Sequence, residues 1–381
     1  MTGPLAGVRV IELAGLGPGP FAAMMLADLG AEVIRVDRAG AARGGNPDAP
    51  PADVLNRGRR SVGLDLKHPD GVETLLRLID SADALIEGFR PGVCERLGVG
   101  PEVCMARNPT LVYGRVTGWG QDGPLAQQAG HDINYVALSG TLSMIGRKGQ
   151  GPVPPVNLVG DAGGGGMLLA VGVLAGIVSA RSSGVGQVVD AAMVDGAALL
   201  GSMIYGLGAM GLWGGERGSN LLDTGAHFYD VYETADGKYI SLGAIEPQFY
   251  VEMLERLDIG EHELADQYDS KQWDANRAVI ARRVLERTQG EWDAAFEGSD
   301  ACYAPVLDMT QAREHPHIDE RGTFVEIAGV VQPAPAPRFS QTPTSIPVPP
   351  AHAGQHTSAV LADFGFSDEE VATLRDSGAV A

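Results

Sequence analysis

Residues 8–37 read VRVIELAGLGPGPFAAMMLADLGAEVIRVD, and this stretch decides the fold. The apolar runs at residues 8–13 and 32–36 are short and rich in valine and isoleucine, which predicts two β-strands. Residues 21–29 between them predict a helix. Because strands joined by a helix in this way run parallel, the stretch predicts the first βαβ unit of a parallel sheet.

The same rhythm continues along the first third of the chain. Residues 69–81 predict a helix, and residues 82–86 and 111–116 predict further apolar strands. We therefore expect an α/β fold, in which a Rossmann-like large domain has a parallel sheet with helices on both faces. Ligands of such sheets bind beyond the carboxyl ends of the strands.

Beyond residue 225 the pattern becomes that of a smaller α+β domain. Two short strand patterns at residues 228–233 and 238–242 surround Asp236-Gly237, which predicts a hairpin. Helical patterns follow at residues 247–257 and 273–287.

The last helix is marked at both ends. Ser367 can cap its start, Glu370 completes a capping box three residues later, and Gly378 ends it. Together these patterns predict four regions: a large Rossmann-like domain at 1–200, a linker at 201–224, a small α+β domain at 225–325, and a C-terminal segment at 326–381 that returns to the large domain.

The composition argues against several classes of protein. The 381 residues include 28 basic and 48 acidic side chains, and the net charge of -20 argues against a nucleic-acid partner. Cys94, Cys104 and Cys302 lack the spacing of a metal site, and their odd number predicts a reduced, cytoplasmic protein. The first residues lack a basic segment followed by an apolar one, so we expect no signal peptide.

Two uncharged stretches are long enough to cross a membrane as helices. Residues 162–180 and 196–215 contain no Asp, Glu, Lys or Arg. Both stretches are rich in glycine, and basic flanks and aromatic belts are weak or absent. We therefore expect buried core helices and no membrane span.

The turn after the first strand allows two interpretations. Residues 17–22 match GxGxxA, and Asp37 follows twenty residues on, as in a dinucleotide-binding fingerprint. However, Pro18 and Pro20 remove backbone N–H groups from the loop that would hold a pyrophosphate. A nicotinamide-dependent dehydrogenase is therefore kept only as an alternative.

A local excess of basic residues follows this turn. Residues 35–67 contain seven basic side chains (Arg35, Arg38, Arg43, Arg57, Arg59, Arg60, Lys67) against four acidic ones. In an acidic chain this basic island suits a phosphorylated small molecule. The alternative is a solvated face held by salt bridges.

Three further segments carry candidate catalytic groups. His131 lies among small and apolar neighbours, and a lone histidine of this kind is more often structural than catalytic. Asp161 precedes a run of four glycines and could equally be a helix N-cap. Glu246 follows a predicted strand and precedes a helix, where the helix dipole favours a carboxylate in any case.

Motifs spread along the chain resemble the family III CoA-transferase superfamily. They lie at residues 8–36, 65–67, 88–92, 117–124 and 184–193 and in the capped C-terminal helix. Within it, residues 130–135, 160–161 and 244–250 are most similar to the branch whose members racemise 2-methylacyl-CoA thioesters. The resemblance runs in order over nearly the whole chain, except that residues 40–52 match poorly and contain an insertion.

The resemblance implies an isomerase that inverts the 2-methyl centre of 2-methylacyl-CoA thioesters. It also implies an interlocked homodimer with the site between subunits, and no cofactor beyond the CoA of the substrate. His131 and Asp161 would be the acid/base pair, Glu246 would orient or polarise His131, and Asp132 would join their hydrogen-bond network. Contacts to CoA would come from Arg38, Leu64, Asp65, Leu66, Lys67, Gly88, Phe89, Arg90, Arg96, Gly130, Ile133, Asn134 and Tyr135.

These residue types suit the chemistry. Racemisation removes the proton beside the thioester carbonyl and returns one to the opposite face, which needs two acid/base groups. Burial is expected to raise the pKa of Asp161 so that it works beside a histidine near neutral pH. We also expect residues 163–166 to begin a helix whose free N–H groups stabilise the enolate.

Besides the dehydrogenase, two rival functions remain. In a CoA-transferase of the same superfamily, the aspartate at position 161 would attack the thioester and form an anhydride. His131 argues against this, because transferases of the superfamily generally lack it. A CoA-binding module without catalytic activity would not need the His131 and Asp161 pair.

Overall fold

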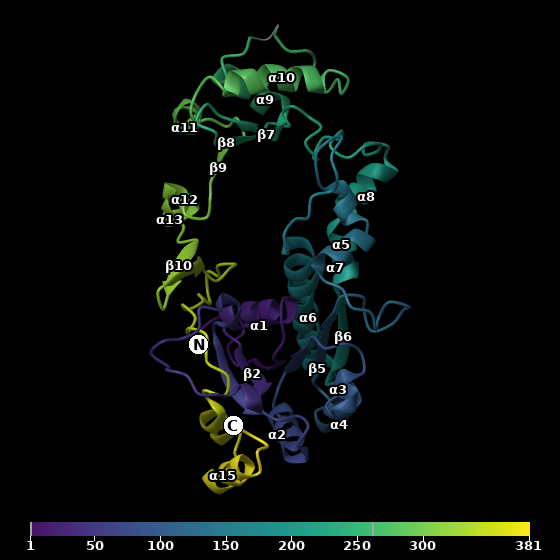
Figure 1. Cartoon of the computed structure of the whole chain (residues 1–381), viewed down its shortest axis with the longest axis vertical. Helices are drawn as coiled ribbons and strands as arrows, with labels where there is room; N and C mark the ends of the chain where they lie inside the picture. Colours follow the sequence, from purple (N-terminus) through teal and green to yellow (C-terminus); the bar gives the residue numbers. More distant parts are fainter. Residues whose placement is uncertain (1, 261–262) are drawn as a thin grey trace. The chain divides into compact units, whose positions relative to one another are not determined.

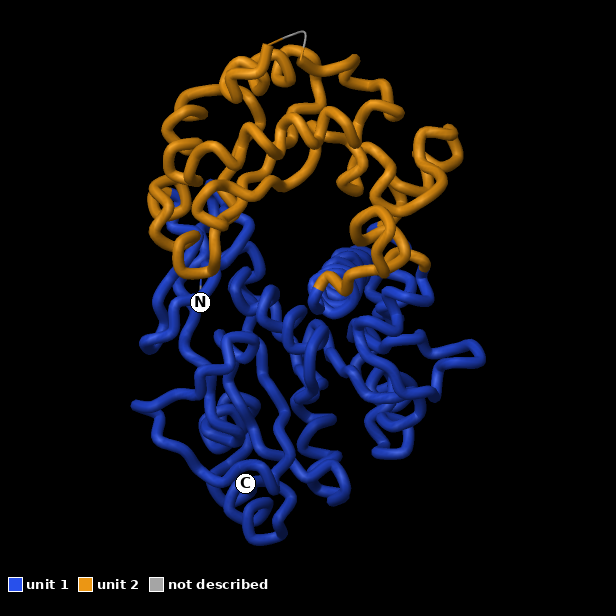
Figure 2. The backbone as a smooth tube through the Cα atoms, turned by 45° about the horizontal axis from the view of Figure 1, so that its top comes forward, with its two compact units in different colours: residues 1–139, 156–200, 321–381 blue, residues 140–155, 201–320 orange. Residues whose placement is uncertain are grey.

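The computed structural model describes residues 2–260 and 263–381, and the chain forms two compact units (Figure 2). Unit 1 comprises Met1–Ser139, Val156–Leu200 and Arg321–Ala381, and unit 2 comprises Gly140–Pro155 and Gly201–Glu320. Each unit has its own sheet and its own hydrophobic core, and each is described by itself below.

Unit 1 is built on a six-stranded sheet in which every neighbouring pair of strands is parallel. The strand order β3-β2-β1-β4-β5-β6 is that of dinucleotide-binding doubly wound sheets. The predicted parallel α/β sheet is therefore confirmed. The strands are β1 (Arg9–Leu13), β2 (Glu32–Arg38), β3 (Arg59–Leu64), β4 (Ala84–Glu87), β5 (Val112–Thr117) and β6 (Gln187–Ala192).

Helices cover both faces of this sheet, as predicted (Figure 1). Val10 of β1 faces a core formed with α1 (Pro18–Asp28) and α6 (Leu168–Ser183), whereas its neighbour Ile11 faces one formed with α2 (Pro69–Ile79) and α14 (Thr357–Asp363). The other helices of unit 1 are α3 (Val93–Arg96), α4 (Pro101–Arg107), α5 (Asp132–Leu138), the π-helix η4 (Leu158–Met167), α7 (Met193–Leu200) and α15 (Asp368–Asp376), with 3₁₀ turns η1 (Ala39–Ala41) and η2 (Val54–Asn56).

The C-terminal segment of the chain belongs to the edge of this sheet. Ser367 and Glu370 form the predicted capping box of α15, because the side chain of each accepts from the backbone N–H of the other at 3.2 and 2.7 Å. Beyond the helix, Val380 forms an antiparallel bridge with Leu64 of β3. Earlier in the same segment, β10 (Phe324–Ile327) and β11 (Val330–Pro333) form a separate hairpin.

Unit 2 contains a three-stranded antiparallel sheet with helices around it. The predicted hairpin is confirmed, because β7 (Tyr229–Glu233) and β8 (Tyr239–Gly243) are joined through Gly237, whose φ of 73° is easiest for glycine. The third strand is β9 (Tyr303–Val306). The helices are α8 (Ser202–Ala209), α9 (Pro247–Arg256), α10 (Trp273–Val284), α11 (Gln289–Phe296), α12 (Gln311–Glu314) and α13 (Pro316–Glu320), with the 3₁₀ turn η3 (Thr141–Met144).

The boundaries of the units differ from those expected from the sequence. Residues 140–155, assigned above to the large domain, and 201–224, assigned to a linker, both belong to unit 2, and unit 1 resumes at residue 321. The buried Asp230 is one reason, because its carboxylate accepts from Arg147 at 2.8 Å and from Arg277 at 3.0 Å. Such long-range ion pairs have no signature in the local sequence.

The two uncharged stretches have different structures. Residues 158–183 form one helical run that is long and apolar enough to cross a membrane, and 44% of its most apolar window is buried in the chain. Leu169, Val173 and Ile177 of this run pack in the core beneath the sheet, as expected of a core helix. The second stretch is divided between α7 and α8, and because α8 carries no buried residue, the expectation of a buried helix is wrong there.

Candidate active site

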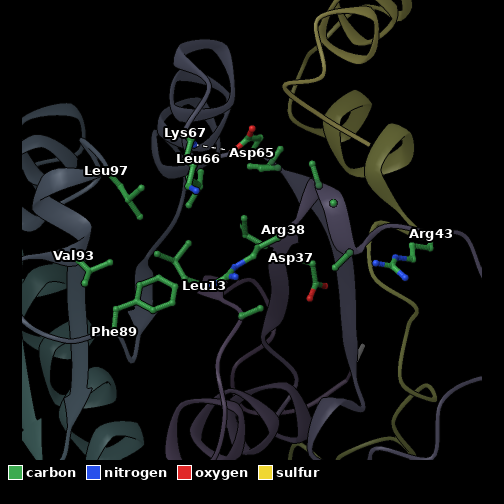
Figure 3. A pocket seen from close by; sticks show the side chains of 16 residues that line it. Leu13, Asp37, Arg38, Arg43, Asp65, Leu66, Lys67, Phe89, Val93 and Leu97 are labelled. Carbon is green, nitrogen blue, oxygen red and sulfur yellow. Dashed lines mark hydrogen bonds between the residues drawn. The ribbon is translucent and has the colours of Figure 1, made fainter. Parts of the chain in front are cut away.

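A cavity of about 850 Å³ lies at the carboxyl ends of β1, β2 and β3 in unit 1 (Figure 3). This is the edge at which ligands of doubly wound sheets are expected. Six of the predicted CoA contacts line it: Arg38, Leu64, Asp65, Leu66, Lys67 and Phe89. Apolar residues that the sequence reasoning did not single out, among them Leu13, Val36, Val93 and Leu97, complete the wall.

The basic island divides into two sets of side chains. Arg57 donates to both carboxylate oxygens of Asp28 at 3.1 and 2.6 Å, and Arg59 lies 2.7 Å from Glu12. Both arginines are buried, so the expectation that they bind a phosphorylated ligand is wrong. They pair with buried carboxylates instead, and the attraction within each pair offsets part of the cost of burying its charges.

Of the other five cations, Arg35 is paired with Asp37 and Arg60 with Glu32 and Asp363, whereas three are better placed for a ligand. Arg38, Arg43 and Lys67 line the cavity, and no ion pair to them is found in the described part of the chain. The carboxylate of Asp37 also lines the cavity, but it is already paired within the chain. It accepts hydrogen bonds from Arg35 at 2.8 Å and from Ser61 at 2.6 Å. The expected electrostatic site for phosphate groups therefore narrows to these three side chains.

A second hollow of about 290 Å³ has one lining residue, Phe89, in common with the first. Its lining includes the predicted residues Gly88, Phe89, Arg90, Gly130, His131 and Tyr135. The structure thus brings most of the predicted binding residues to two hollows that have Phe89 in common. Arg96, Ile133 and Asn134 line neither of them.

The start of α5 positions His131. Its backbone N–H donates to the side-chain oxygen of Asn134 at 3.0 Å, and the N–H of Asn134 donates to the carbonyl of His131 at 2.8 Å. Asn134 therefore has a local capping contact within unit 1. Ile133, on the same turn, is 44% exposed.

Asp132 is tied directly to the segment that carries Asp161. Its carboxylate accepts the backbone N–H of Asp161 at 2.7 Å. A Cβ at the preceding Gly160 would overlap that carboxylate, so the contact requires glycine there. Burial, followed by the negative charge of Asp132, raises the pKa of Asp161, which confirms the expected direction.

The helix that carries Asp161 begins earlier than expected. It is π-helical from Leu158, with Asn157 as its N-cap, so the interpretation of Asp161 as the N-cap is wrong. Residues 163–166 lie inside this helix rather than at its start, and the expectation that they offer free N–H groups to an enolate is wrong for that reason.

Close packing explains the glycine run instead. A Cβ at Gly164 would lie 2.8 Å from the backbone nitrogen of Ala197, and one at Gly165 would lie 2.7 Å from the Cβ of Pro18. The run therefore lets η4 approach α7 and α1 more closely than any side chain would allow.

Tyr135 is held in a narrow slot in the wall of the second hollow. Its ring packs edge-on against Trp119 with centroids 4.7 Å apart, and a Cβ at Gly118 or Gly130 would collide with it. Burial and the negative charge of Asp161 raise the pKa of the Tyr135 phenol. The aromatic pair is a feature that the sequence reasoning missed, because Trp119 and Tyr135 belong to different motifs.

Glu246 belongs to unit 2, where it is the N-cap residue of α9. The prediction of a carboxylate between a strand and a helix is confirmed, since β8 ends at Gly243 and α9 begins at Pro247.

Among the residues that the structure describes, no group of three or more His, Cys, Asp and Glu side chains could hold a metal ion.

Comparison with known proteins assigns the chain to a family. The model of CoA-transferase family III matches residues 5–357, and the chain belongs to that family. Among its relatives, alpha-methylacyl-CoA racemase of Mus musculus is 46% identical over 97% of this chain and 96% of its own length, and the Homo sapiens racemase is 45% identical over the same shares. Succinyl-CoA:glutarate CoA-transferase of Homo sapiens is 29% identical over 99% of this chain and 90% of its own length.

Solved structures agree with the family assignment. The Rv3272 protein of M. tuberculosis is 28% identical, covers 94% of this chain and 99% of its own, and superposes with a TM-score of 0.77. A CAIB/BAIF family protein from Brucella suis is 24% identical with a TM-score of 0.80 over 96% of this chain and 100% of its own, which supports the fold alone.

Proposed function

We propose that this chain is an isomerase that inverts the 2-methyl centre of 2-methylacyl-CoA thioesters by 1,1-proton transfer through an enolate. The observation that carries the proposal is the 45–46% identity, over nearly the full length, to curated racemases of two mammals. The chain's own residues provide a chemical account of the same activity.

The two hollows suggest how the substrate is held. The larger one presents Arg38, Arg43 and Lys67 around apolar walls, which suits the phosphates and nucleotide of CoA. The smaller one has His131 in its lining and suits the thioester end. Because Phe89 lines both, the extended CoA arm would pass beside it.

His131 and Asp161 would act as the acid/base pair on opposite faces of carbon 2. In one direction, neutral His131 removes the proton while protonated Asp161 returns one, and the roles exchange in the other direction. Burial and the charge of Asp132 raise the pKa of Asp161, which shifts this carboxyl towards the protonated form that the first of these directions needs. Asp132 supports this state through its charge and holds Asp161 through the backbone contact.

Glu246 would orient or polarise His131 and so favour the tautomer that accepts the substrate proton. The reaction needs no cofactor besides the CoA carried by the substrate, because the thioester itself makes the adjacent proton acidic. No nucleic acid takes part, consistent with the net charge of -20.

The active form would be an interlocked homodimer with the site between subunits. Val171 and Val178, two turns apart on α6, are 64% and 70% exposed in the single chain. A second copy of the chain would remove these side chains from water.

The test is an NMR assay in D₂O with one epimer of a 2-methylacyl-CoA and no acceptor acid. Deuterium at carbon 2 together with the opposite epimer supports the racemase. If neither appears, and CoA moves to an added carboxylic acid, the chain is a transferase with Asp161 as nucleophile.

A further inference from the structure

We propose that Gln267, assisted by Tyr268, is a positioning residue that fixes the turn carrying Glu246. This inference rests on the proposed function, in which Glu246 acts on the catalytic histidine. It concerns a side chain outside all of the motifs used above, and its contacts lie entirely within unit 2.

The contacts converge on the two residues that precede Glu246. The side-chain amide of Gln267 donates to the carbonyl of Ala244 at 3.1 Å and to that of Ile245 at 2.8 Å. The hydroxyl of Tyr268 donates to the same Ile245 carbonyl at 2.6 Å. Three hydrogen bonds from two side chains therefore hold two successive carbonyls of one turn, which fixes the direction in which the chain enters α9.

Gln267 and Tyr268, called the clip below, lie in a well-packed part of unit 2. Gln267 is 9% exposed, and its carbonyl accepts the indole N–H of Trp273 at 2.8 Å. Ala244 is fully buried. Buried carbonyls without a donor would be costly, so alternative conformations of the turn are disfavoured. After the turn, the N–H of Tyr250 donates to the carbonyl of Glu246 at 3.0 Å and begins the helix.

A cysteine beside the turn offers a readout independent of catalysis. The N–H of Gly243 donates to the carbonyl of Cys302 at 2.9 Å. Burial, then the charge of Glu246, then that of Asp300 raise the pKa of the Cys302 thiol. Cys302 is exposed, whereas Cys94 and Cys104 are buried and have pKa values raised to about 12.

The experiment compares Gln267→Leu with Gln272→Leu, a matched change at an exposed position five residues on. Glu246→Gln sets the full effect of losing the carboxylate. For each full-length variant, alkylation of Cys302 by iodoacetamide is followed against pH, and kcat and KM are measured for racemisation.

We expect Gln267→Leu to lower kcat on the order of tenfold with KM changed less than about twofold, because a small displacement of an orienting group affects chemistry more than binding. We also expect the thiol pKa of Cys302 to fall towards its value in Glu246→Gln, so that alkylation at pH 8 becomes roughly two- to fivefold faster. Gln272→Leu should leave both readouts at wild-type values.

Wild-type kcat and Cys302 titration in a folded Gln267→Leu variant, while Glu246→Gln changes both, would overturn the proposal. If Gln267→Leu does not fold, Tyr268→Phe replaces it in the test. Wild-type kcat and Cys302 titration in Tyr268→Phe would then overturn the proposal. If Glu246→Gln leaves racemisation unchanged while Gln267→Leu still shifts the Cys302 titration, the clip positions Glu246 and the catalytic role of Glu246 is what fails.

Discussion

The carboxylate of Asp132 accepts the backbone N–H of Asp161 at 2.7 Å, although the two residues are 29 positions apart. Asp132 is the first residue of α5, directly after His131, so this single bond links the segments that carry both proposed acid/base groups. Because this bond is made to the backbone, it positions the first turn of η4. The negative charge of Asp132 also acts on the Asp161 carboxyl.

The first prediction separates these two effects of Asp132. Asp132→Asn keeps the shape but removes the charge that raises the pKa of Asp161, so the limb of the pH–rate profile that belongs to Asp161 should move to lower pH. We expect kcat to fall on the order of tenfold. Racemisation rates from pH 5 to 9 give the measurement, and an unmoved profile contradicts the assignment.

The second prediction concerns the proposed pair. Asp161→Asn should abolish inversion, with a loss of roughly 100-fold or more, because only one face of carbon 2 retains a base. His131 should still exchange the proton on its own face with D₂O. NMR distinguishes exchange with retained configuration from racemisation. Asp122→Asn, at an exposed position in the same unit, is the control, and full racemisation by Asp161→Asn would refute the pair.

The third prediction tests the packing role of the glycine run. Gly165→Ala should destabilise the protein by about 1–3 kcal/mol, because the new Cβ would lie 2.7 Å from Pro18 and 2.9 Å from Met193. The control is Gly290→Ala in α11, where a Cβ meets nothing within 4 Å, and helix propensity predicts no loss of stability. Urea denaturation measures both, and equal stabilities would contradict the close approach.

The fourth prediction separates structural from ligand-binding arginines. Arg57→Met leaves Asp28 buried without its partner and should lower the free energy of unfolding by about 3–5 kcal/mol. Arg38→Gln should keep stability but raise KM for acyl-CoA roughly tenfold or more, since it loses a charged contact to phosphate. Denaturation and steady-state kinetics on both variants give the measurements. Unchanged stability with a raised KM in Arg57→Met would show that Arg57 binds the ligand.

The fifth prediction concerns the dimer. Val178→Glu places a charge on the apolar face of α6 and should shift the protein from dimer to monomer in light scattering coupled to gel filtration. Racemase activity should fall in parallel if the site lies between subunits. Ala106→Glu, at an exposed position of α4 in the same unit, is the control for surface charge. A wild-type protein that is monomeric while fully active contradicts the proposal.

Local patterns account for the elements that the sequence predicted well. The capping box of α15 depends on Ser367 and Glu370, three residues apart, and the β7–β8 hairpin depends on Gly237 at its turn. The βαβ rhythm of residues 8–37 likewise predicted the parallel sheet and the edge at which the cavity lies. The family resemblance added His131, Asp161 and Glu246, which no local pattern distinguishes from structural residues.

Strand β3 shows what local patterns cannot supply. Its residues 59–64 follow a charged segment that reads as a basic surface, yet Arg59 is buried against Glu12 of β1. A basic side chain becomes a ligand contact or half of a buried ion pair according to which carboxylate faces it. That carboxylate lies 29 residues away for Arg57 and on another strand for Arg59.

The sequence by itself therefore determined the class of fold, the ends of several elements and, through its motifs, the family. Only the tertiary structure decided which arginines are free to meet a ligand, why residues 163–166 are glycine, and how Asp132 reaches Asp161. The physical reason is that propensity, capping and turn chemistry act within a few residues, whereas burial, ion pairing and close approach depend on whatever the folded chain brings alongside.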